Sequence, residues 1–252
     1  MAKPVLGIDV GGSGIKGALV DIKQGELIEE RFRLDTPQPA TPEAMAQTFA
    51  RVVEGTGYTS GPIGVGFPAI VHNGTALSAA NIDQSWLGRN VERLFGQTVG
   101  KRVYVCNDAD AAGLASRMAG SARKQRGTVL FLTLGTGIGS AMFTNGKLVR
   151  NTEFGHVYLK GMDIVAEKYC ANSIRKKQEL SFEEWGKRLD EYLHHMNRLT
   201  TPDLILLGGG ISKKFDLYSQ YLTIDVPIRP AELRNEAGII GAALYGHDCA
   251  KG

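Results

Sequence analysis

Residues 5–17 of the chain are VLGIDVGGSGIKG. The segment Val5–Val10 is short, mostly apolar and followed at once by the glycine cluster Gly11–Gly14. A run of this length before clustered glycines is typical of a buried strand that leads into a tight turn. From Ile15 to Leu34 small and apolar residues alternate with polar ones, so further strands are expected after the turn.

The glycines of this turn also match a different motif. Gly12, Gly14 and Gly17 have the spacing of the dinucleotide-binding fingerprint, which requires a helix directly after the turn. Here strand periodicity follows, interrupted by the turn residues Lys23-Gln24-Gly25. The pattern therefore favours a glycine hairpin over a dinucleotide fold, and an NAD titration would test the rejected alternative.

The order of strand, glycine turn and second strand recurs about 120 residues later. Thr128–Leu134 resembles a buried strand, Gly135-Thr136-Gly137 a turn, and Ile138–Phe143 a second strand before the hairpin turn Asn145-Gly146. This repeat predicts an α/β protein of two lobes with a cleft between them. We expect a small lobe at 1–108, joined by a C-terminal helix at 237–250, and a large lobe at 109–236.

The remaining elements follow from caps and periodicity. Thr41-Pro42-Glu43 is a helix start, with Gly55 as its expected end, and Ser181 with Glu184 forms a capping box before an amphipathic helix. Other strands are expected at 27–34, 63–67, 103–106 and 204–207, and other helices at 109–119 and 237–245.

Composition limits the partners. The 252 residues carry a net charge of only +3, which indicates neither nucleic acid nor a membrane surface as a partner. Three separated cysteines without a CxxC pair argue against a disulfide framework, and no apolar run is long enough to span a membrane. A cytoplasmic location is expected.

The two glycine turns are candidate phosphate sites, because backbone without side chains brings several N–H donors together. Asp9, beside the first turn, is suited to hold Mg²⁺ through water, although a carboxylate there also serves as a turn cap. One turn alone is weak evidence. Two such turns strengthen the case for a phosphate ligand.

Other polar residues have two roles open. Asp108 follows a strand and precedes a helix, where it caps the helix or accepts a proton. Glu153 and His156 are three residues apart with a glycine between them. They either bind one small polar ligand together or have a purely structural role. The basic runs Arg175-Lys176-Lys177 and Lys213-Lys214 are ordinary solvated surface unless an anionic ligand is long.

Six ordered motifs make the chain resemble the polyphosphate-using glucokinases of the ROK sugar-kinase family, within the actin-like ATPase (ribonuclease H-like) superfamily. The resemblance covers nearly the whole length. The motifs are Gly7–Gly17, Gly66-Phe67-Pro68, Ala80–Asp83, Asn107–Ala111, Leu134–Ser140 and Asn151–His156.

The resemblance implies phosphorylation of the 6-hydroxyl of glucose, with mannose as a further acceptor and Asp108 as the general base. Polyphosphate, and ATP as well, would be the donor, with Mg²⁺ as cofactor, and a homodimer is expected. The implied sugar-binding residues are Asn81, Asn107, Glu153, His156 and Glu167. The implied phosphate-binding residues are Asp9, Gly11, Gly12, Gly14, Lys16, Gly135, Thr136, Gly137 and Gly209, where Gly209 belongs to the turn that flanks adenosine in nucleotide-using relatives.

Two departures from the family limit what the resemblance implies. Many members carry a zinc-binding cysteine cluster after the Gly-His pair, whereas only Cys170 lies nearby here, so zinc is not expected. The second departure is the spacing from His156 to Glu167, on which the assignment of Glu167 depends.

Two other functions stay open. A sugar-sensing regulator of the same family would carry a DNA-binding segment before the kinase core, and the strand beginning by Val5 leaves no room for one. An ordinary ATP-dependent hexokinase would need an apolar slot for adenine, whereas polyphosphate would need a track of cations. The candidates for such a track are Lys16, Lys147, Arg150, Lys160 and Arg175-Lys176-Lys177.

Overall fold

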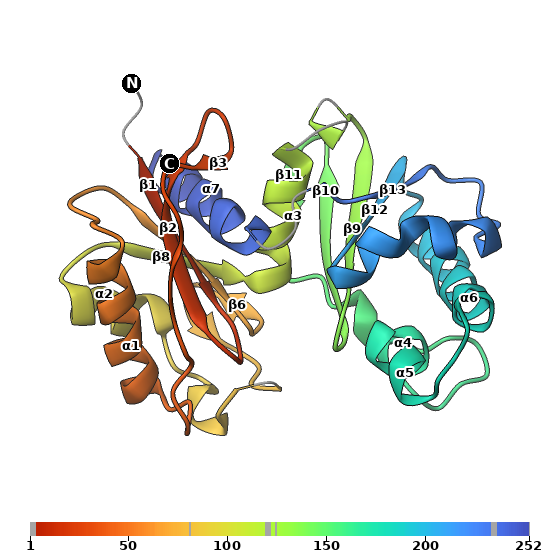
Figure 1. Ribbon diagram of the computed structural model, residues 1–252, viewed down its shortest axis with the longest axis horizontal. Coiled ribbons are helices and arrows are strands. Elements are labelled where there is room, and N and C mark those ends of the chain that lie inside the picture. The colour runs from red at the N-terminus through yellow and green to blue at the C-terminus, as the bar shows by residue number, and fades with distance from the viewer. Residues whose placement is uncertain (1–3, 81, 119–121, 124, 233–235, 252) are drawn as a thin grey trace. The chain divides into compact units, whose positions relative to one another are not determined.

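A computed structural model describes residues 4–80, 82–118, 122–123, 125–232 and 236–251. The chain forms two compact units, one of Met1–Ala119 with Asn235–Gly252 and one of Gly120–Arg234. Each unit is built on its own sheet (Figure 1). No helix within the described ranges combines the length and the apolar character that crossing a membrane requires.

The first unit has a sheet with strand order β3-β2-β1-β5-β8, and β4 also pairs with β2. β1 is antiparallel to β2 and parallel to β5, which is parallel to β8. The strands are β1 Val5–Val10, β2 Ile15–Asp21, β3 Glu26–Leu27, β4 Phe32–Leu34, β5 Ile63–Phe67 and β8 Val103–Asn107, and a separate hairpin consists of β6 Val71–His72 and β7 Thr75–Ala76.

The single strand expected at 27–34 is wrong. Leu27 pairs with Val20 and Leu34 with Ile15, so β3 and β4 pair with opposite ends of β2. The chain between them leaves the edge of β2, because one continuous strand at this position would need a longer partner.

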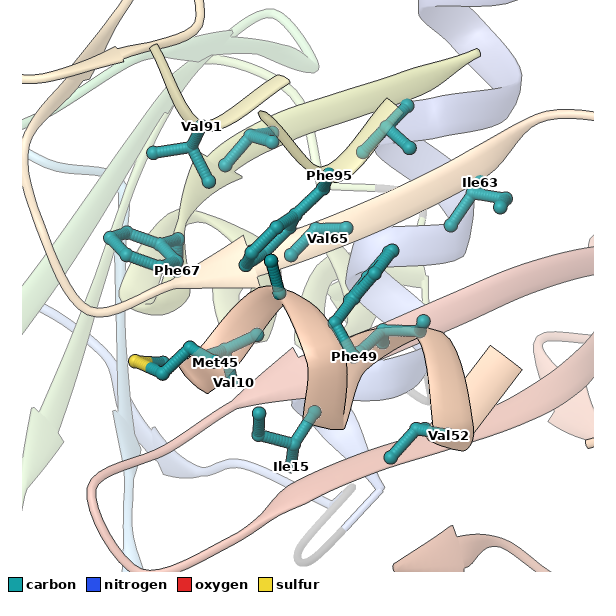
Figure 2. Packing of buried hydrophobic residues seen from close by; sticks show 14 of the residues in the cluster. Val10, Ile15, Met45, Phe49, Val52, Ile63, Val65, Phe67, Val91 and Phe95 are labelled. Atoms are coloured by element: carbon teal, nitrogen blue, oxygen red, sulfur yellow. The ribbon is translucent and has the colours of Figure 1, made fainter. Parts of the chain in front are cut away.

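One face of this sheet is covered by α1 (Pro42–Gly55) and α2 (Val91–Val99). Their rings Phe49 and Phe95 stack with centroids 4.3 Å apart, and Figure 2 shows them packed among the aliphatic side chains of the strands. Trp86, in the short 3₁₀ helix η1 (Gln84–Trp86), meets Phe67 edge-on at 4.8 Å. These aromatic residues make this layer the main apolar core of the unit.

Both ends of α1 lie where the sequence predicts them. The Thr41 side chain accepts the Ala44 N–H at 3.4 Å, which confirms the predicted start. The helix ends at Gly55, as expected, and Thr56 is its C-cap. A Cβ atom at Gly55 would lie 2.5 Å from Cε1 of Phe32, so this glycine is required by packing.

The other face carries α7 (Ala237–Lys251), which packs on β1, β5 and α3 (Asp108–Met118). A Cβ atom at Gly64 would overlap the carbonyl oxygen of Ala242, and one at Gly241 would overlap that of Ala111. The backbones touch because both positions lack side chains. This contact keeps α3 in the first unit, whereas the sequence analysis placed the boundary at Asp108.

The second unit repeats the plan, with strand order β11-β10-β9-β12-β13. β9 is antiparallel to β10 and parallel to β12, as β1 is to β2 and β5. The strands are β9 Thr128–Leu134, β10 Ile138–Thr144, β11 Lys147–Val149, β12 Leu204–Gly208 and β13 Ile228–Pro230. The repeat that the sequence analysis inferred is present, and β13 is an addition that it did not predict.

Helices pack beside this sheet around a core that includes Trp185, Tyr192 and Tyr218. The predicted capping box is confirmed, since the Ser181 side chain accepts the Glu184 N–H and the Glu184 side chain accepts the Ser181 N–H. The helical segments are η3 Phe154–His156, α4 Ala166–Cys170, α5 Asn172–Lys177, α6 Phe182–Thr200, η4 Gly210–Leu217 and η5 Ser219–Tyr221.

Candidate active site

The first glycine turn joins β1 to β2 and is closed by a hydrogen bond from the Gly11 N–H to the Gly14 carbonyl oxygen, at 3.0 Å. Nη2 of Arg33 donates to the Ser13 carbonyl oxygen at 2.9 Å. A Cβ atom at Gly14 would lie 2.7 Å from Nε of Arg33, so the guanidinium fills the space that a side chain would take. Gly12, at the tip of the turn, is exposed, and its backbone is accessible to a ligand.

Asp9 and Lys16 lie directly opposite each other at the start of this hairpin. Nζ of Lys16 is 3.3 Å from Oδ2 of Asp9, and each side chain is about four-fifths buried (25% and 21% exposed). A Cβ atom at Gly238 would lie 2.8 Å from Cγ of Asp9, so the carboxylate rests against the first turn of α7. A helix start favours negative charge there, which suits both an anion and a carboxylate.

Asp9 is also the residue that would hold Mg²⁺. In the part of the chain that the structure describes, no group of three or more His, Cys, Asp or Glu side chains is arranged to hold a metal ion. Mg²⁺ commonly keeps several waters and needs only one or two carboxylates besides substrate phosphates. The partly exposed Asp9 carboxylate fits that kind of site.

Asn107 and Asp108 stand at the carboxyl end of β8, on the same sheet edge as the end of β1. The Asn107 Oδ1 atom accepts the backbone N–H groups of Ala109 (2.8 Å) and Asp110 (3.2 Å), and its Nδ2 donates to the Ala69 carbonyl oxygen at 3.1 Å. Asn107, which is only 7% exposed, therefore caps α3.

This arrangement changes the expected division of roles between the two residues. Because Asn107 provides the cap, Asp108 becomes the first residue of α3 and is exposed. Its Oδ1 also receives the Ala109 N–H at 2.8 Å, which holds the carboxylate at the helix start. Asn107 has little hydrogen-bonding capacity left for a sugar, whereas the position of Asp108 suits a base. Asn81, the other sugar-binding candidate of this unit, lies outside the described residues.

The second glycine turn joins β9 to β10 and repeats the closure of the first: the Gly135 N–H donates to the Gly137 carbonyl oxygen at 3.0 Å. Its carbonyl groups are bound by one residue of α5. The Ser173 N–H donates to the Gly135 oxygen at 3.0 Å and the Ser173 hydroxyl to the Thr136 oxygen at 2.6 Å. These bonds occupy carbonyl oxygens that would otherwise repel an anion.

Gly209 flanks this turn. Its φ is +82°, and a Cβ atom there would lie 2.8 Å from the Leu134 carbonyl oxygen, at the end of β9. Both the N–H and the hydroxyl of Ser212 donate to the Gly209 oxygen, at 3.1 and 2.8 Å. The close approach explains why a glycine stands at this position, and it places the start of η4 beside the second turn.

Glu153 precedes η3 and His156 ends it, and the two side chains lie in contact. Nδ1 of His156 lies 3.3 Å from Oε2 of Glu153, with the two side chains 53% and 33% exposed. A Cβ atom at the intervening Gly155 would overlap the Ile138 carbonyl oxygen, so this glycine lets η3 lie against β10. Oγ of Ser140 accepts the Phe154 N–H at 3.1 Å, which fixes the segment.

Glu167 belongs with this pair. Its Oε1 is 3.1 Å from Nζ of Lys168 and its Oε2 is 3.4 Å from the Ile138 nitrogen, beside the second glycine turn. Burial raises the pKa of Glu153, His156 opposes that rise, and the charge of Glu167 adds to it. His156 and Glu167 thus both lie within electrostatic reach of Glu153 in the second unit, although Glu167 is fourteen residues away in the sequence.

Sequence reasoning missed two features of the site. Ser173, which binds the second turn, lies in a helix of only six residues that no expected element included. Gly238, which leaves room for Asp9, was assigned only to a closing helix of small residues. The sole sequence signal was the small residue type at each position.

Comparison with known proteins extends these observations to the whole chain. A model of the ROK family matches residues 5–174. The polyphosphate glucokinase of Mycobacterium tuberculosis is 47% identical over 239 residues, which cover 94% of this chain and 89% of that protein.

Solved structures give the same result. The inorganic polyphosphate/ATP-glucomannokinase of Arthrobacter sp. strain KM superposes with a TM-score of 0.89 at 46% identity, covering 99% of each chain. A ROK glucokinase of Streptomyces griseus, at 23% identity and a TM-score of 0.81 over 98% of this chain and 100% of that one, shares the fold. The expected α/β class and two-lobed actin-like ATPase fold are confirmed. Because the family model and the relatives together cover most of its length, the chain belongs to the ROK family.

Proposed function

We propose that this protein is a glucokinase that transfers the terminal phosphoryl group of inorganic polyphosphate to the 6-hydroxyl of glucose. The observation that carries the proposal is a glycine turn at the end of the first strand of each unit, in a chain 47% identical to a polyphosphate glucokinase. Such turns present backbone N–H donors to phosphate oxygens. Polar side chains suited to sugar hydroxyls accompany them.

In the proposed reaction Asp108 accepts the proton of the 6-hydroxyl as that oxygen bonds to the terminal phosphorus. The bond from this phosphorus to the bridging oxygen breaks, and the bridging oxygen leaves with the electron pair on a polyphosphate shortened by one unit. Glu153, His156 and Glu167 bind the other sugar hydroxyls. Their two carboxylates accept hydrogen bonds, and the imidazole donates or accepts one.

Lys16 and the two glycine turns hold the donor phosphates and offset the charge that develops during transfer. Asp9 would hold Mg²⁺ through water. When bound, this ion supplies positive charge to the donor oxygens. The ammonium of Lys16 orients the Asp9 carboxylate at 3.3 Å.

ATP and mannose are proposed as a second donor and a second acceptor, because the solved relative at 46% identity is described as a polyphosphate/ATP-glucomannokinase. A homodimer also stays a prediction, which light scattering of the purified protein tests.

The test is a matrix of donors (long polyphosphate, tripolyphosphate and ATP) against acceptors (glucose and mannose), with Mg²⁺ present. Product is measured as hexose 6-phosphate, and Asp108→Asn is the control for contaminating kinases. The proposal expects the highest kcat/KM for long polyphosphate with glucose, falling as salt rises because exposed charges are screened over about 10 Å at 0.1 M. A higher kcat/KM for ATP at every salt concentration would leave an ordinary ATP-dependent hexokinase.

A further inference from the structure

Two basic segments begin at the second glycine turn. One is α5, whose Ser173 binds the carbonyl oxygens of Gly135 and Thr136. The other is η4, which follows Gly209 where that residue packs against the end of β9. Both segments belong to the second unit, and both lead away from the turn with lysine or arginine side chains, namely Arg175, Lys176 and Lys177 in α5 and Lys213 and Lys214 in η4.

These segments meet at one aromatic ring. Cζ of Arg175 lies 4.6 Å from the centroid of the Phe182 ring, and Nζ of Lys214 lies 5.9 Å from it. Tyr218, fully buried, stacks on the same ring with centroids 6.5 Å apart and an angle of 18° between the planes. Arg175 and Lys214, which are 39 positions apart in the chain, therefore place two positive charges at the same Phe182 ring.

In the described part of the chain, both positive charges of this pair lack a carboxylate ion-pair partner. Nε of Arg175 donates to Oδ1 of Asn172 at 3.1 Å, an uncharged partner that orients the guanidinium and leaves its charge intact. By contrast, Lys168 and Lys187 in the same unit are paired with glutamates.

The ligand that fits this arrangement is a polyanion with regularly spaced charges. Arginine and lysine bind phosphate oxygens, and arginine does so with several N–H groups at once. An adenine base would need an apolar surface on which to stack, and the Phe182 ring is already occupied by the two cations and by Tyr218. The geometry therefore favours further phosphates over a nucleoside.

We propose that Arg175 and Lys214, held on Phe182, bind internal phosphates of a polyphosphate whose reacting end lies at the Gly135–Gly137 turn. This inference rests on the proposed function and deepens it by naming a distal subsite that selects polymeric donors. The contact of Ser173 with the turn links the subsite to the phosphate that reacts.

The experiment uses the double variant Arg175→Gln/Lys214→Gln. The control is Arg198→Gln/Arg229→Gln, which removes from the same unit two exposed positive charges that form no ion pair with a carboxylate among the described residues. For each protein kcat/KM is measured with long polyphosphate, tripolyphosphate and ATP at about 0.05 and 0.2 M salt. Glucose affinity and thermal unfolding verify that the variants are folded.

We expect the Arg175/Lys214 variant to lose about tenfold or more in kcat/KM for long polyphosphate, as two charge-assisted contacts disappear. Its kcat/KM for tripolyphosphate, which lacks the distal phosphates that the proposal assigns to the pair, should stay within about twofold of the unmodified protein. The salt dependence with long polyphosphate should weaken. The control pair should behave like the unmodified protein.

Other results overturn the inference in distinguishable ways. If the unmodified protein uses no polyphosphate, the proposed function fails and the subsite with it. If it does, but the variant keeps its full rate with long polyphosphate, the proposed function stands and the subsite is wrong. Equal losses with tripolyphosphate, or in the control pair, would also refute a distal subsite.

Discussion

Nζ of Lys16 lies 3.3 Å from Oδ2 of Asp9 because strand register places the two residues opposite each other in β1 and β2. The glycine turn beyond them closes through its own backbone hydrogen bond. The pair is therefore positioned by regular sheet geometry, and the turn is left to bind a ligand.

Replacing Lys16 by Met should lower kcat by about 10²-fold, in the range seen when one preorganised donor to a reacting group is removed. Because both side chains are mostly buried, Lys16→Met leaves the Asp9 carboxylate without its partner, and the free energy of unfolding should fall by about 1–3 kcal/mol. Steady-state kinetics and denaturant unfolding measure the two effects separately. A large loss of stability with unchanged turnover would make Lys16 a structural residue.

Asp108→Asn should lower turnover by roughly 10²- to 10⁴-fold, the usual contribution of a positioned acid or base, while glucose still binds. The amide keeps the shape of the side chain and cannot accept the proton. Single-turnover kinetics and glucose calorimetry on the same folded sample test this. Near-normal turnover would exclude Asp108 as the base.

Asn107→Ala should act mainly on stability. It removes the cap of α3 and leaves the N–H groups of Ala109 and Asp110 without the Asn107 oxygen, so we expect a loss of about 0.5–2 kcal/mol in the free energy of unfolding. Asn107→Asp should retain much of the stability, since a carboxylate also caps a helix start. If Asn107→Ala unfolds like the unmodified protein yet loses glucose affinity, the residue binds the sugar after all.

Glu153→Ala and His156→Ala should each weaken glucose binding by about 1–3 kcal/mol, because sugar hydroxyls or the remaining partner are left unpaired. Calorimetry on both variants gives the affinities directly. Lys160→Ala, a charge change in the same unit, serves as the control. Unchanged glucose affinity in both variants would mean that Glu153 and His156 have only a structural role.

The raised pKa of Glu153 makes a prediction about pH. Burial favours its protonated form, so the folded state binds a proton more readily than the unfolded state does, and stability falls as pH rises from the ordinary glutamate range through the raised pKa. Glu153→Gln should therefore unfold at a higher temperature than the unmodified protein above that range. The difference should shrink at acid pH, and a difference independent of pH would contradict the assignment.

Local patterns in the sequence were sufficient for much of the fold. The strand and glycine turn at Val5–Gly14 and the capping box of Ser181 and Glu184 depend on residues only a few positions apart, and the structure contains both. The repeated plan of strands was visible for the same reason. An expectation failed where pairing with a distant segment decides, as at residues 27–34, which pair with opposite ends of β2 as two short strands.

The candidate site divides in the same way. The sequence by itself determined the glycine turns, the carboxylates beside them and the family, because these are properties of short contiguous motifs. Only the tertiary structure decided that Asn107 rather than Asp108 caps α3, that Glu167 lies near Glu153, and that Arg175 and Lys214 share one ring. The physical reason is that hydrogen-bond capacity and charge are shared among groups that meet only when the chain folds. Residue type and spacing show which groups are present, and packing decides which of them are already occupied.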